Sequence, residues 1–116
     1  MKGYEEVRAK VKAIVDERPD YVYAIVDPNV GYGAMYFDSL GYPSCLVGHY
    51  LAGEGYGPGD VIEGRTVKYQ NRLRPDFTDE AWNFLRMVQD YQDSQLPWGD
   101  AYHCAEREMA DDGVTL

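Results

Sequence analysis

The chain of 116 residues has the length of one domain, and 45% of its residues are hydrophobic, so it can bury a core of its own. Its formal net charge of −9 disfavours direct binding to nucleic acid, since phosphate contacts need lysine and arginine. The start MKGYEEVRAK shows no secretory signal, no apolar run approaches the roughly 18 residues of a membrane span, and two cysteines do not make a disulfide scaffold. We expect a single globular domain, residues 1–116, in the cytoplasm and without membrane association.

Residues 3–18 are expected to form an amphipathic helix. Its apolar residues fall within about 100° of one another on a helical wheel; they are Tyr4, Val7, Val11, Ile14 and Val15. Pro19 ends the helix, because the residue before a proline is pushed out of the helical region of backbone conformation.

The segment 21–37 is predicted to form an antiparallel β-hairpin. YVYAIV (21–26) and AMYF (34–37) are rich in β-branched and aromatic residues, which favour strands. Between them DPNVGYG supplies proline, asparagine and glycine for the reversal of the chain. An isolated hairpin is marginally stable in water, so its apolar face should pack on helices.

GYPSCLVGHYLAGEG, residues 41–55, indicates a second helix at 43–53 with Pro43 in its first position. No charged residue occurs between Ser44 and Gly53, and a helix that is apolar all round is a buried one. We therefore place this helix at the centre of the fold. The glycine-rich GEGYGPGD that follows is interpreted as an irregular turn, because it lacks the Gly-Lys-Ser/Thr ending of a phosphate loop.

The chain from residue 59 to its end is predicted to be mainly helical. A short helical turn at 59–63 is favoured over a strand at 66–69. DFTDEAWNFLRMVQDYQDSQ then forms a helix with Thr78 as its N-cap, and PWGDAYHCAEREMADD forms the last one. One face of the first of these helices carries Ala81, Phe84, Leu85, Val88, Tyr91 and Gln92. The expected fold class is α+β: about four helices around a buried central helix (43–53), with one antiparallel β-hairpin (21–37).

Cys45 and His49 are the residues that most resemble a reactive or metal-binding pair. A cysteine in the first turn of a helix can be a nucleophile, and an i, i+4 pair suits zinc. Two further alternatives are a metal site that adds His103 and Cys104 to this pair, and a Cys45–Cys104 disulfide. We favour core packing, because free cysteine behaves as a small hydrophobe and the whole stretch is apolar. No catalytic residue, metal or cofactor is therefore predicted.

Charge is unevenly distributed along the chain. Residues 65–75 carry four basic and no acidic residues, whereas residues 76–116 carry ten acidic and two basic ones. We expect the four basic side chains to lie beside the acidic helices or to face water. A site for phosphate or for an acidic partner is the alternative; it would use Arg65, Lys68, Arg72 and Arg74.

Tyrosine is unusually frequent, with 11 residues in 116, most of them in the middle of the chain. Tyrosine is enriched in binding surfaces, because it provides a large contact area with little entropy to lose. The candidates for exposure and partner contact are Tyr32 in the hairpin loop, Tyr56 in the glycine-rich turn, and Trp82. Trp82 falls about 120° from the centre of the apolar face of its helix; packing against the hairpin or the last helix is the alternative for its ring.

Two elements of the sequence carry a resemblance. PSCLVG (43–48), and QD (92–93) followed by PWG (97–99), are similar to elements of a family of small uncharacterised proteins from actinobacteria and their bacteriophages. The resemblance covers about two-thirds of the chain. It implies a small accessory protein in a bacterial cytoplasm, with a phage as one origin, and it implies no activity.

The favoured function is that of an acidic interaction protein that binds a protein partner, such as a host protein, through tyrosine- and tryptophan-rich loops and acidic helices. One alternative is a small Cys/His-dependent enzyme or zinc-binding module. Another is an inhibitor that mimics the charge of nucleic acid, motivated by the acidic C-terminal segment. The sequence leaves homo-oligomer formation open.

Overall fold

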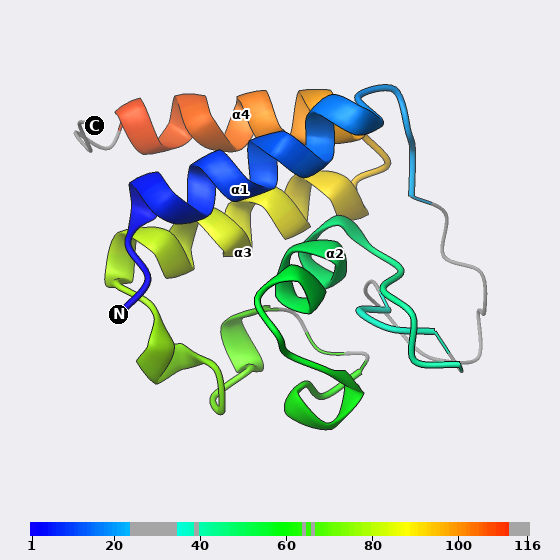
Figure 1. Cartoon of the computed structure of the whole chain (residues 1–116). Helices are drawn as coiled ribbons and strands as arrows, with labels where there is room; N and C mark the ends of the chain where they lie inside the picture. Colours follow the sequence, from blue (N-terminus) through cyan, green and yellow to red (C-terminus); the bar gives the residue numbers. More distant parts are fainter. Residues whose placement is uncertain (24–34, 39, 64, 66, 112–116) are drawn as a thin grey trace.

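Four α-helices make up most of the residues that the computed structural model describes, which are 1–23, 35–38, 40–63, 65 and 67–111 (Figure 1). They are α1 (Tyr4–Glu17), α2 (Leu46–Gly53), α3 (Asp79–Asp93) and α4 (Trp98–Asp111). Between α2 and α3 the chain makes three short 3₁₀ turns, η2 (Pro58–Asp60), η3 (Val67–Tyr69) and η4 (Arg74–Asp76). None of the described helices is long and apolar enough to cross a membrane.

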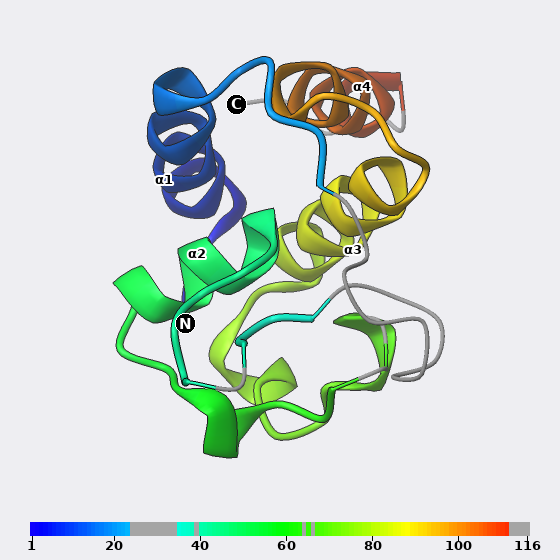
Figure 2. The same ribbon diagram turned by 90° about the vertical axis from the view of Figure 1, so that its right-hand side faces the viewer.

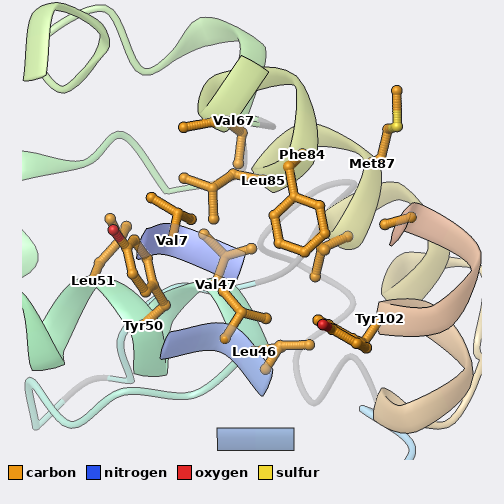
Figure 3. Packing of buried hydrophobic residues seen from close by; sticks show 14 of the residues in the cluster. Val7, Leu46, Val47, Tyr50, Leu51, Val67, Phe84, Leu85, Met87 and Tyr102 are labelled. Carbon is orange, nitrogen blue, oxygen red and sulfur yellow. The ribbon is translucent and has the colours of Figure 1, made fainter. Parts of the chain in front are cut away.

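The helices α1, α3 and α4 lie alongside one another, and α2 packs against α1 and α3 (Figures 1 and 2). Side chains from all four helices, together with Val67 from η3, converge on one core (Figure 3). Residues 35–38 and 40–45, which lead into α2, and the described residues between α2 and α3 lie on the side of α3 away from α4 (Figure 2). Residues 19–22 instead contact the start of α4. We call the four helices the helical half, and the described residues of 35–45 and 54–78 the loop half.

The three long helices confirm the sequence pattern. Four of the five apolar residues expected on α1 are buried, and Ile14 packs partly buried against the core. The hydroxyl of Thr78 accepts a hydrogen bond from the Ala81 N–H at 3.2 Å, as an N-cap should. Asp79 and Glu80 follow in the first turn of α3, where negative charge stabilises the positive end of the helix dipole.

The predicted α+β class is wrong, because the described residues contain no strand and no hairpin. Residues 24–34 lie outside the described part, and the two ends of the predicted hairpin are bonded elsewhere. Val22 forms an isolated bridge with Pro97, and Phe37 forms one with Pro43. The carbonyl oxygens of Met35 and Tyr36 accept from Cys45 N and Ser44 N at 3.1 and 2.9 Å. Backbone groups that a hairpin ladder would use are thus paired with other segments.

The helix α2 begins at Leu46, three residues later than predicted. Pro43 and Ser44 are extended along residues 35–37, and Cys45 is the N-cap. The Sγ atom of Cys45 accepts a hydrogen bond from the Gly48 N–H at 3.3 Å. Five of the eight residues of α2 are buried, so the prediction that it is a buried helix holds for most of its surface. The predicted turn at 59–63 begins as η2, and Val67–Tyr69 is a 3₁₀ turn rather than a strand.

Three buried glutamine side chains hold backbone groups in place: Gln70 within the connection between α2 and α3, and Gln89 and Gln92 from α3 to η3 and to the start of α2. Gln70 accepts from Ile62 N at 2.7 Å and donates to the carbonyl oxygens of Ile62 and Arg65 at 2.8 and 3.1 Å. Gln89 accepts from Val67 N at 2.6 Å, and Gln92 accepts from Leu46 N at 2.7 Å. Since buried backbone N–H groups need partners, these amides provide what a β-ladder would otherwise provide.

Candidate functional site

Large apolar side chains that face solvent are found outside the α-helices of the described chain. In the loop half they include Tyr42, which is 66% exposed, Ile62 at 59% and Tyr69 at 50%. The complete set is Met1, Tyr21, Val22, Leu40, Tyr42, Ile62 and Tyr69. Single exposed apolar residues are ordinary, but this restriction to loops and turns matches where binding residues are usually placed.

One group of these residues combines an aromatic ring with positive charge. The ring of Tyr69 has the guanidinium of Arg65 at 5.8 Å and the ammonium of Lys68 at 5.7 Å from its centroid. Both distances are within the range of cation–π attraction. Ile62 belongs to the same group, because the side chain of Gln70, the next residue after Tyr69, is bonded to both its N–H and its carbonyl. We call Ile62, Arg65, Lys68 and Tyr69 the aromatic–basic patch.

The backbone beneath the aromatic–basic patch is fixed by buried groups. The carbonyl of Arg65 accepts from Gln70 Nε2 and, at 2.8 Å, from the Tyr36 hydroxyl. The Tyr36 hydroxyl in turn accepts from Gln89 Nε2 at 2.8 Å, and Gln89 is bonded to Val67 N. A backbone held in this way loses little conformational entropy when the patch binds a partner.

The other two basic residues of the 65–75 segment are occupied by acidic ones. Arg72 Nε lies 3.3 Å from a carboxylate oxygen of Asp60. Arg74 forms an ion pair with Asp79 at the start of α3 and donates to the Phe77 carbonyl at 2.9 Å. The expected placement beside the acidic helices is therefore correct for Arg74. Within the described residues, Arg65 and Lys68 make no ion pair.

The structure places two of the three predicted partner-binding residues, Tyr56 and Trp82, against the same ring, that of Phe77. The Tyr56 and Trp82 rings lie 6.4 and 5.5 Å from the Phe77 ring. Trp82 is only 8% exposed and also contacts the Arg74 guanidinium, so its expected exposure is wrong. Tyr56 is partly buried, and its hydroxyl donates to Asp76 at 2.6 Å. Tyr32 lies outside the described residues.

Cys45 and His49 have the positions of packing residues. The Cys45 side chain is 0% exposed, and burial raises the pKa of its thiol to about 12, so the thiol stays protonated at neutral pH. His49 is half-buried, with its ring against Trp98 at 5.5 Å, and burial lowers its pKa. No cluster of three or more metal-ligating side chains occurs in the described ranges. In this conformation the buried, protonated Cys45 thiol is poorly placed to act as a nucleophile.

A cleft of about 230 Å³ lies between α1 and α2. Its lining residues are Lys10, Ala13, Ile14, Tyr50, Gly53 and Glu54. The Tyr50 hydroxyl is buried and has no hydrogen-bond partner among the described residues, and Lys10 and Glu54 form an ion pair of 2.7 Å. Because these two charges neutralise each other, the cleft offers a ligand less electrostatic attraction than the aromatic–basic patch.

Asp93, the last residue of α3, is a partly buried carboxylate that accepts from Gln92 Nε2 at 3.0 Å. Burial raises its pKa to about 6, against the opposing effect of that hydrogen bond. The native state therefore holds a proton that the unfolded chain has released between about pH 4 and pH 6. Stability consequently falls as the pH rises through this window, and the ionised carboxylate destabilises the fold at neutral pH.

Asp93→Asn is expected to stabilise the protein at pH 7.5 by about 1 kcal/mol, a value reduced for solvent screening of a partly buried group. The asparagine oxygen can still accept from Gln92, while the charge is removed. Urea denaturation of both proteins between pH 4 and pH 8 measures the effect. The gain should shrink towards pH 4; a gain that is independent of pH would contradict the assignment.

Comparison of the chain with protein-family models, with curated proteins and with solved structures found no match. The resemblance to small actinobacterial and phage proteins therefore stays a prediction.

Sequence reasoning found the cations of the aromatic–basic patch but missed Ile62 and Tyr69. Tyr69 lies within the basic segment RTVKYQNRLRP and directly follows Lys68, which is evident from the sequence. The exposure of the Tyr69 ring depends on the conformation of η3, in which Val67 is buried and bonded to Gln89. That consequence of tertiary hydrogen bonding has no signal in the local sequence.

Proposed function

We propose that this chain is an interaction protein that binds a protein partner through its loop half. The observation that carries the proposal is the restriction of large exposed apolar side chains to loops and turns. Loops held on a rigid scaffold commonly carry binding sites. Tyr69 and the Arg65 guanidinium over its ring are of residue types that are enriched in protein interfaces.

The acidic surfaces of α3 and α4 form a second part of this proposal. Their exposed residues include Asp79, Glu80, Asp90, Asp100 and Glu108. Charges of one sign on a surface steer association and exclude partners of the same sign more than they add affinity. We assign the binding contacts to the loop half and the selection of partners by charge to the acidic helices.

Photo-cross-linking in the organism's own cells tests this function. A benzophenone amino acid placed at Tyr42 or Tyr69 is expected to give a discrete adduct with a partner. The same group at Asn83, on the exposed face of α3, is the matched control and should not give that adduct. Equal labelling from all three positions, or none from the two loop positions, would contradict the proposal.

A further inference from the structure

We propose that the aromatic–basic patch binds an acidic peptide segment of a protein partner. This inference rests on the proposed function and deepens it by naming the chemistry that the partner presents. The patch consists of Ile62, Arg65, Lys68 and Tyr69, as defined above.

Charge is the first argument. Arg65 and Lys68 are exposed and make no ion pair within the described residues, in a chain whose net charge is −9. Arg72 and Arg74, by contrast, are paired with Asp60 and Asp79. Two cations that lie within 6 Å of the Tyr69 ring thus give this part of an acidic molecule a local positive charge. Their chemical complement is a carboxylate-bearing segment.

The apolar part of the patch is the second argument. The Tyr69 ring and the Ile62 side chain are half or more exposed, and the ring lies within 6 Å of both cations. A peptide residue with an apolar side chain can pack on them while flanking carboxylates meet Arg65 and Lys68. Since Gln70 and Gln89 already fix the backbone of the patch, peptide binding requires little further ordering of that backbone.

The short range of electrostatic attraction in salt solution favours a peptide over a nucleic acid as the ligand of the patch. At physiological salt the screening length is about 8 Å, so a short segment senses mainly the cations that it touches. A nucleic acid extends its phosphates well beyond that distance. Those phosphates would be repelled by the rest of a chain whose net charge is −9. The patch therefore fits a short acidic peptide better than a polyanion.

The test uses the full-length protein and a short synthetic peptide with glutamates on both sides of one tryptophan. Binding is measured by fluorescence anisotropy and by amide chemical shifts at 0.15 M salt, about physiological. A second peptide with glutamines in place of the glutamates, and a single-stranded oligonucleotide, are titrated in parallel. Saturable binding of the glutamate peptide is expected, with the largest shift changes at residues 62, 65, 68 and 69.

The double variant Arg65→Gln/Lys68→Gln should weaken this binding about tenfold, since it removes both charges that the peptide meets. The matched control, Lys12→Gln/Arg86→Gln, changes the net charge equally at helix positions outside the patch and should alter the affinity by less than about twofold. Tyr69→Ala should weaken binding, and Tyr69→Phe should retain it, because the ring rather than the hydroxyl makes the contact.

Several results would overturn the inference: no saturable binding, equal affinity for the glutamine peptide, tighter binding of the oligonucleotide, or equal weakening by the control double variant. Cross-linking from Tyr42 and Tyr69 in the Arg65→Gln/Lys68→Gln background separates this from the proposed function. If adducts persist there unchanged, the interaction stands and the acidic-peptide assignment fails. If they are absent from the wild type as well, the proposed function itself fails.

Discussion

Gly48→Ala is expected to lower the free energy of unfolding by about 3 kcal/mol or more, the upper range for overpacking a well-packed interior. A Cβ atom at Gly48 would lie 2.1 Å from the carbonyl oxygen of Tyr36 and 2.8 Å from its carbonyl carbon. Both atoms belong to the backbone, so no side-chain rotation can relieve the overlap. Either α2 or the segment around Tyr36 has to move.

Neither element is free to move. The Tyr36 carbonyl accepts from Ser44 N at 2.9 Å, and the Tyr36 N–H donates to Glu63 at 3.0 Å. The Tyr36 hydroxyl is bonded to Arg65 and Gln89. A shift of the Tyr36 backbone would therefore disturb hydrogen bonds to several separate segments, which is why a single methyl group should have so large an effect.

The same helix supplies a matched control for Gly48→Ala. Gly53, its last residue, is exposed, and an added Cβ there has nothing within 4 Å. Gly53→Ala should change stability by about 0.5 kcal/mol or less. Urea denaturation of the two variants beside the wild type makes the comparison; similar stabilities for both variants would show that α2 does not pack on Tyr36 as described.

Gln89→Leu is expected to destabilise the protein by about 2–4 kcal/mol, although leucine has a similar size and is more hydrophobic. The Gln89 amide is fully buried and is bonded to Val67 N and to the Tyr36 hydroxyl. Leucine would leave the Val67 N–H buried without an acceptor, and an unpaired buried donor costs the full free energy of its desolvation.

The control for Gln89→Leu is Asn83→Leu, an amide-to-aliphatic change on the exposed face of α3. It should change stability by about 0.5 kcal/mol or less, because its amide has water as an alternative partner. Thermal and urea denaturation measure both variants. A Gln89→Leu protein as stable as the wild type would mean that hydrophobic gain outweighs the two lost hydrogen bonds, contrary to our account.

The long helices were predictable because the apolar pattern and the capping residues that define each helix lie within its own segment of the sequence. The apolar stripe of α1 repeats at helical spacing, and Thr78 with two acidic residues after it marks the start of α3. Gln92 also stood on the predicted apolar face of α3 and is fully buried in the structure. A polar amide on an apolar stripe is a readable sign of a buried hydrogen-bonding group, although the sequence does not say which segment it bonds.

The loop half was not predictable in the same way. AMYF has the composition of a strand, but Tyr36 and Phe37 donate their N–H groups to the Glu63 carboxylate, 27 and 26 residues along the chain. Long-range contacts of this kind override local β-propensity. The candidate site was likewise predictable only in part. Arg65 and Lys68 were named from the charge pattern alone. The burial of Trp82 against Phe77 and Arg74 depends on tertiary packing, which a helical wheel does not represent.

Amide hydrogen exchange measured by NMR tests most directly the claim that buried glutamines hold the loop half in place. Leu46 is the first residue of α2 and Val67 the first of η3, so neither N–H has a partner within its own element. We predict that both amides, and that of Ile62, are protected in the wild type, and that Gln89→Leu abolishes protection at Val67 while sparing Leu46. Rapid exchange of all three amides in the wild type would contradict the account.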